Sequence, residues 1–242
     1  MTAFFRGASY LIEGYKMLSH PSLRLWVVLP FMGNLVTMAL LLSGLWTQVA
    51  AIEAWLTDFL PAMLAWLTWL ILPLLFILLL WAFSFFFIML LNLFASPLLS
   101  ILAEKTNQIL ASTEIAPPTS WQHMLIEPLK RQGQKWLYAV PRLGGVALLM
   151  MLPIVGQTIG PVMWFCLTSW LLAVEYGDYF FENQQQNFAA TRAAIQKNRW
   201  LHFGFGCATM VMLLIPFVNC LIMPAAVCGA TKLWYDTTKK AN

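Results

Sequence analysis

The stretch "SHPSLRLW" at residues 19–26 combines groups that can hold an oxyanion. Pro21 suits the first position of a helix, because its missing N–H group would have no intrahelical partner there. The N–H groups of Ser22, Leu23 and Arg24 would then lie free at the positive end of the helix dipole. Arg24 adds a full charge and a planar set of donors. The stretch therefore predicts a site for sulfate or phosphate, the alternative being that Arg24 only extends to a membrane surface.

Two long uncharged stretches are each interrupted by a pair of prolines eight residues apart, in "PIVGQTIGP" and "PFVNCLIMP". In the stretch 143–174, 10 residues precede Pro153 and 14 follow the break. Helical arms of these lengths reach about 15 and 21 Å, short of the ~30 Å core of a bilayer. We therefore predict re-entrant helical hairpins at 143–174 and 200–232. The alternative for each is one full span kinked at its prolines.

The two breaks carry small or uncharged polar residues, namely Gly156, Gln157, Thr158 and Asn219. In the broken helices of transporters, the N-terminus of a half-helix at mid-membrane depth points at anionic substrates. A turn at that depth is tolerated only where it is buried in protein or lines a cavity. These four residues are therefore candidates for an anion path, the alternative being that they only turn the chain and pack.

The composition indicates an integral membrane protein with one all-α membrane domain over residues 1–242. Hydrophobic residues make up 60% of the chain and charged residues 10%, against about 25% charged residues in soluble domains. Uncharged stretches cover 25–52 and 59–103. Because about 20 residues cross a bilayer core, we predict long transmembrane helices at 25–52 and 70–95, in contact with the lipid bilayer. No basic cluster forms on a soluble module, which argues against nucleic-acid binding.

The other segments are polar or amphipathic. An N-terminal amphipathic helix is predicted at 2–18, lying at the membrane interface. Its apolar face would comprise Phe4, Ala8, Leu11, Tyr15 and Leu18. Polar helical segments are predicted at 104–142 and 175–199. All 14 lysines and arginines lie before residue 25, in these two segments or after residue 231. Two spans and two hairpins place all of them on one side, which the positive-inside rule identifies as cytoplasmic.

Three carboxylates, Glu175, Asp178 and Glu182, stand at i, i+3 and i+7 and would share one helical face. Metal-dependent membrane enzymes use such carboxylates with histidines, but the three histidines here are far apart in the sequence. We therefore expect ion pairs within the polar segment, with Arg192, Lys197 and Arg199 as the partners. The chain has no phosphate-binding loop for ATP. We predict no catalytic residue, no metal and no cofactor, and reduced cysteines.

Four stretches carry a family resemblance. They are "SLRLWVVLP" at 22–30, "FASPLLSILAE" at 94–104, "VEYGDYFFE" at 174–182 and "FGFGCATMVMLLIPFVNCLIMPAAVCGATKLW" at 203–234. With them the chain resembles the CysZ-type sulfate permeases of bacteria over nearly its full length. The last block, with its FG, IPFVN and GAT elements, is the most specific.

The resemblance implies an inner-membrane permease that imports sulfate for cysteine biosynthesis, with sulfite as a further candidate substrate. It also implies two spanning helices, hemi-penetrating hairpins and a homo-oligomer. The family's sulfate site lies near a Gly-Leu-Arg element before the first span, which corresponds here to Ser22, Leu23 and Arg24. Leu25 follows where family members can carry a second arginine, so the expected charge is lower. The alternative function is a non-transporting membrane scaffold or assembly factor.

Overall fold

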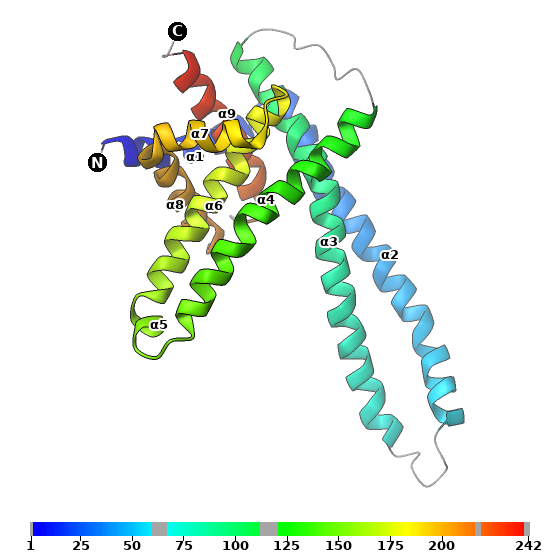
Figure 1. Cartoon of the computed structure of the whole chain (residues 1–242). Helices are drawn as coiled ribbons and strands as arrows, with labels where there is room; N and C mark the ends of the chain where they lie inside the picture. Colours follow the sequence, from blue (N-terminus) through cyan, green and yellow to red (C-terminus); the bar gives the residue numbers. More distant parts are fainter. Residues whose placement is uncertain (1, 60–66, 112–120, 216–218, 240–242) are drawn as a thin grey trace. The chain divides into compact units, whose positions relative to one another are not determined.

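The computed structural model describes residues 2–59, 67–111, 121–215 and 219–239. These residues form helices and contain no strand, so the prediction of an all-α protein is confirmed. The helices are α1 (Thr2–Met17), α2 (Pro21–Phe59), α3 (Thr68–Ala111), α4 (Trp121–Met150), α5 (Val155–Thr158), α6 (Gly160–Asn183), α7 (Phe188–Lys197), α8 (Arg199–Leu213) and α9 (Asn219–Lys239) (Figure 1). Across the described ranges, none of the helices combines the length and the apolar character needed to cross a membrane.

The chain divides into two compact units. Unit 1 comprises Met1–Val27 and Ser96–Asn242, and unit 2 comprises Val28–Ala95. Unit 2 contains most of α2 and the first part of α3, in which large apolar side chains such as Trp69 and Trp81 are exposed. Unit 1 contains the core, in which α6 packs against α4, α7, α8 and α9. Both ends of the chain and all the predicted site residues belong to unit 1.

The two longest helices extend beyond the predicted segments. The segment predicted at 25–52 lies inside α2, and the segment predicted at 70–95 lies inside α3, which continues to Ala111. A proline inside a helix removes one backbone hydrogen bond, yet Pro97 does not end α3. The turns after Pro97 are anchored instead, because Leu99, Leu102 and Ala103 are buried in the core of unit 1.

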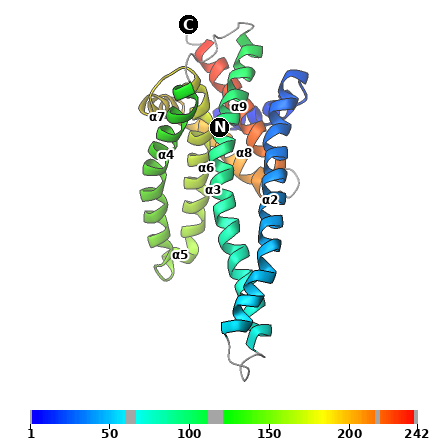
Figure 2. The same ribbon diagram turned by 90° about the vertical axis from the view of Figure 1, so that its right-hand side faces the viewer.

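The first proline-flanked break is a reversal of the chain. Helix α4 ends at Met150, a short turn and the four-residue α5 follow, and α6 begins at Gly160 (Figures 1 and 2). Ile154 has a positive φ of 71°, an uncommon conformation for a branched residue, and it lies in this turn. A Cβ atom on Gly156 would lie 2.2 Å from the carbonyl oxygen of Met150. Only glycine therefore allows the chain to pass so close to the end of α4.

The second break differs from the first in where its helix resumes. Residues 216–218 lie outside the described residues, and α9 begins at Asn219. Pro224 therefore lies inside α9, whereas Pro161 lies in the first turn of α6. The second arm of this stretch therefore begins before the second proline, unlike that of the first stretch. Pro161 removes no hydrogen bond from α6, because the N–H groups of a first helical turn have no intrahelical partner. Pro224 lies beyond the first turn of α9, so it removes one backbone hydrogen bond from that helix.

The polar segments are not separate helices. The segment 104–142 is divided between the end of α3 and the first two-thirds of α4, with 112–120 outside the described residues. The segment 175–199 is divided between the end of α6 and α7. Polar and apolar stretches therefore share continuous helices, α4 and α6. This continuity fixes the polar side chains of one helix against those of the other.

Helix α1 is part of the core, where Leu11 of the predicted face is buried and Tyr15 and Leu18 pack partly buried, but the core-facing side also includes residues that were not predicted. The buried residues are Gly7, Tyr10, Leu11 and Gly14. An added Cβ on Gly7 would lie 1.8 Å from the carbonyl oxygen of Leu201 in α8, and one on Gly14 would lie 2.1 Å from that of Ala225 in α9. The two glycines let the backbone of α1 lie directly against the backbones of α8 and α9. This close approach places Gly7 and Gly14 on the buried face of α1.

We expect Gly7→Ala to destabilise the protein by about 1–3 kcal/mol, because the methyl group forces α1 away from α8. Gly133→Ala in α4 is the control, because nothing lies within 4 Å of a Cβ atom there. Alanine is favoured over glycine inside a helix by about 1 kcal/mol, so this control should not lose stability. Thermal unfolding followed by circular dichroism measures both variants. Equal melting temperatures for the two would contradict the close packing.

Candidate anion-binding site

The predicted oxyanion residues form the first turn of α2. Only Leu18, Ser19 and His20 separate α1 from α2, and the N–H group of His20 donates to the carbonyl of Met17 at 2.9 Å. Leu23 is fully buried, whereas Ser22 and Arg24 are exposed. Leu23 therefore anchors the turn in unit 1 and leaves its two polar neighbours accessible.

Part of the predicted donor set is already engaged. The N–H group of Ser22 donates to Nδ1 of His20 at 3.4 Å, and the N–H group of Leu23 donates to the carbonyl of His20 at 3.0 Å. Nε of Arg24 donates to the carbonyl of Ser19 at 3.3 Å. Within the described residues, the terminal guanidinium nitrogens of Arg24 make no hydrogen bond. Arg24 is therefore held by its inner nitrogen and offers its outer nitrogens to an anion.

An open cavity of about 500 Å³ lies next to this turn, and His20 forms part of its wall. Its lining residues are Glu13, Lys16, Met17, His20, Ile109 and Lys232. They come from α1, the α1–α2 link, the end of α3 and α9, all within unit 1. The close packing of α1 on α9 brings Glu13 within 2.8 Å of Nζ of Lys232.

The residues at the hairpin breaks do not join this site. Gly156 is buried, while Gln157 and Thr158 are exposed in α5, which packs against α4 and α6. The hydroxyl of Thr158 donates to the carbonyl of Ile154 at 2.8 Å. Both views show α5 at the end of the α4–α6 pair opposite to α7. Asn219 is the first residue of α9, and its side chain lies outside the described residues.

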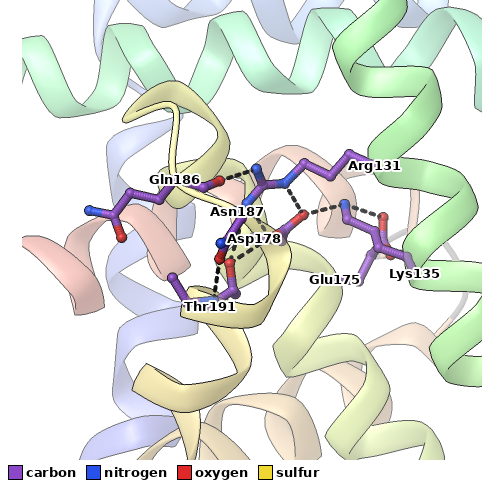
Figure 3. A network of polar contacts seen from close by, with 8 residues as sticks. Arg131, Lys135, Glu175, Asp178, Gln186, Asn187 and Thr191 are labelled. Carbon is purple, nitrogen blue, oxygen red and sulfur yellow. Dashed lines mark hydrogen bonds and ion pairs between the residues drawn. The ribbon is translucent and has the colours of Figure 1, made fainter.

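A charged network joins α4, α6 and α7 (Figure 3). Asp178 of α6 is fully buried and accepts two hydrogen bonds from Arg131 of α4, each at 2.7 Å. The hydroxyl of Thr191 in α7 donates to the same carboxylate at 2.7 Å. Lys135 Nζ lies 3.3 Å from Asp178 and 3.2 Å from Glu175. The network therefore fastens the polar ends of three helices to one another.

The expected partners of the carboxylates were wrong. Arg192 lies over the rings of Tyr138 and Phe188 instead, and Arg199 lies over Trp200. The reversal at α5 makes α4 and α6 antiparallel neighbours, so Arg131 and Lys135 reach Asp178 across more than 40 positions of sequence. Arg131 and Lys135 stand at i, i+4 and therefore share one helical face, as the carboxylates do at i, i+3 and i+7, and this was the signal that could have identified them.

Burial and charge act against each other in this network. Burial alone would raise the pKa of Asp178, but the hydrogen bonds from Arg131 and the charge of Lys135 hold it below its ordinary value. Burial alone would lower the pKa of Lys135, but Glu175, Tyr179 and Asp178 raise it. Burial raises the pKa of Glu182 to about 7. One carboxylate oxygen of Glu182 is buried with no hydrogen-bond partner among the described residues.

The fold and site define a helical protein with an open cavity beside the start of α2, lined by two lysines, a histidine and a glutamate among its residues. The chain matches the family described as "Sulfate transporter CysZ/Etoposide-induced protein 2.4" over residues 10–224, and it belongs to that family. The resemblance inferred from the sequence is thereby confirmed. Because this is a family of transporters, the chain is not expected to be an enzyme, and Asp178 has a structural place in the network.

Several relatives carry the name Sulfate transporter CysZ. The protein from Vibrio cholerae serotype O1 is 36% identical over 233 residues, which cover 94% of this chain and 92% of the relative. The protein from Pectobacterium atrosepticum is 36% identical over 235 residues, covering 95% of this chain and 84% of the relative. The protein from Vibrio parahaemolyticus is 36% identical over 231 residues, with 94% and 93% covered.

Removing Asp178 should be far more damaging than removing Glu175. Asp178→Ala leaves Arg131 without a carboxylate partner and Lys135 with Glu175 alone, and we expect a loss of about 3–5 kcal/mol of stability. The Glu175 side chain is 32% exposed, so Glu175→Ala should cost less than about 1 kcal/mol. Chemical denaturation of the two variants measures the difference. Similar losses in both would show that Asp178 does not hold the helices together.

Stability should also depend on pH through Glu182. Since its pKa rises from 4.5 to about 7, the folded protein holds a proton that the unfolded chain releases. The stabilisation that comes from protonated Glu182 is fully present below pH 4.5 and is lost as the pH rises through 7. We expect the free energy of unfolding to fall across this range in the parent protein and less in Glu182→Gln. Asp178 acts with the opposite sign but below its ordinary pKa of 3.8, outside this window. Equal slopes for both proteins would refute the role of Glu182.

Proposed function

We propose that this protein is a sulfate permease of the bacterial inner membrane. It imports sulfate for assimilation into cysteine, without ATP hydrolysis in this chain and with sulfite as a further substrate. Membership of the sulfate transporter family supports sulfate as the substrate. The single structural observation that carries the site is the exposed first turn of α2, where the outer nitrogens of Arg24 have no partner within the described residues.

The proposed binding step uses Arg24 and the end of α2 together. Desolvating a dianion is expensive, so the site must replace water with fixed donors. Arg24 can present a planar pair of N–H groups to two sulfate oxygens. The helix dipole adds a positive potential at the same place. Ser22 and Leu23 contribute backbone N–H groups only when they leave their His20 acceptors, so sulfate must compete with this local cap.

The proposed membrane arrangement follows from the uncharged stretches. Residues 25–52 in α2 and 70–95 in α3 would cross the bilayer, and the segments 143–174 and 200–232 would enter it and return as hairpins. The reversal at α5 supports the first hairpin, because the arms on either side of it are separate helices. The basic segments would face the cytoplasm. Gly156, Gln157, Thr158 and Asn219 would then lie at the hairpin tips, along the proposed anion path, in a homo-oligomer.

Sulfate flux into proteoliposomes tests the function and the site together. We expect the parent protein to carry labelled sulfate, and Arg24→Ala to lose about tenfold or more in apparent affinity, because a charge-assisted hydrogen bond contributes roughly 1.5–3 kcal/mol. Lys197→Ala is the control, since it removes an exposed basic residue at the end of α7. Undiminished transport by Arg24→Ala would overturn the site. Absence of flux in the parent protein would favour the scaffold.

A further inference from the structure

We infer that the cavity beside the start of α2 is a capture site that holds sulfate before it reaches Arg24. This inference deepens the proposed function and rests on it. The cavity is about 500 Å³, which accommodates a small tetrahedral oxyanion with part of its hydration shell. Its walls belong to the same unit as the first turn of α2, and His20 both lines the cavity and accepts a hydrogen bond from that turn.

The charges on the cavity wall favour an anion. Glu13 and Lys232 form an ion pair at 2.8 Å and offset one another. Lys16 also lines the cavity and is exposed, and it has no ion-pair partner within the part of the chain that the structure describes. With His20 neutral, two lysines and one glutamate leave a net positive charge of one. Lys16 is therefore the cation that is available to a ligand.

His20 connects the cavity to the helix end through its two ring nitrogens. Nδ1 accepts the N–H group of Ser22, so the proton of the neutral ring lies on Nε2. Nε2 is then a donor for an oxyanion in the cavity. The same ring can therefore cap the first turn of α2 through Nδ1 while it donates to a captured anion through Nε2.

Glu13 lowers the affinity of the capture site for an anion. Its carboxylate repels an anion in the cavity and at the same time holds part of the charge of Lys232. A site that passes its ligand onward must release it readily, and a fully cationic cavity would retain a dianion. Removing Glu13 should therefore strengthen sulfate binding, although it also removes an ion pair. A merely structural Glu13–Lys232 pair would give the opposite result or none.

Nitrogen NMR of the full-length protein labelled at histidine tests the inference in maltoside detergent without phospholipid. Sulfate titration should shift the His20 ring resonances and leave those of the buried His202 unchanged. Lys16→Gln should raise the sulfate dissociation constant read at His20 by about threefold, and Glu13→Gln should lower it by a similar factor. In Arg24→Ala, the shift at His20 should persist.

The outcomes separate this inference from the proposed function. A parent protein that transports sulfate while His20 stays unshifted, or while Lys16→Gln and Glu13→Gln bind as the parent does, overturns the capture site alone. If sulfate shifts the His20 ring resonances but the parent protein carries no sulfate flux, the capture site is supported and the proposed permease function is overturned. A lipid phosphate presents the same chemistry, so dihexanoyl phosphatidylglycerol is titrated in parallel. A response to this lipid but not to sulfate would make the cavity a headgroup site and refute the proposal.

Discussion

The backbone contact of α1 with α8 and α9 is the constraint on which the candidate site depends. Gly7 and Gly14 allow α1 to lie directly against carbonyl oxygens of its neighbours, which no residue with a side chain could do without displacement. Glu13 and Lys16 lie on the same helix, and Lys232 lies on α9. The position of α1 therefore sets both the cavity and, through a link of three residues, the start of α2.

In unit 1, the charged network holds α4, α6 and α7 against one another. Asp178, Arg131 and Lys135 replace apolar packing where the polar ends of α4 and α6 meet. A buried pair contributes little net stability, but removing one partner is costly, so shifts of α4 against α6 that separate these charges are disfavoured. Thr191 extends the same restriction to α7. The network therefore fixes how the α4–α6 pair joins the rest of the unit.

The parts of the fold that follow from local chemistry could be predicted from the sequence. The prolines and glycine of "PIVGQTIGP" correctly marked the break between α4 and α6, because their backbone limits act within a few residues. The first turn of α2 at Pro21 followed from the same reasoning. The place of Gly7 on the buried face of α1 could not be foreseen, because a side chain there is excluded by the carbonyl group of Leu201, about 190 positions away in the sequence.

The candidate site shows the same division between local and distant information. Ser22, Leu23 and Arg24 were identified correctly as a helix start, but their N–H groups were expected to be free, whereas His20 accepts hydrogen bonds from two of them. Lys16 and Lys232 could not be joined to the site from the sequence, since α9 reaches it only in the folded unit. The salt bridges of Asp178 were assigned to neighbours in sequence because their true partners lie across a helix reversal.

The most direct test of the account is crystallography of the protein with selenate, a heavier analogue of sulfate that anomalous scattering locates without ambiguity. We expect anomalous density within hydrogen-bonding distance of the outer nitrogens of Arg24 at the first turn of α2. Density confined to the hairpin tip at Gly156–Thr158, with none at α2, would contradict the proposed binding site.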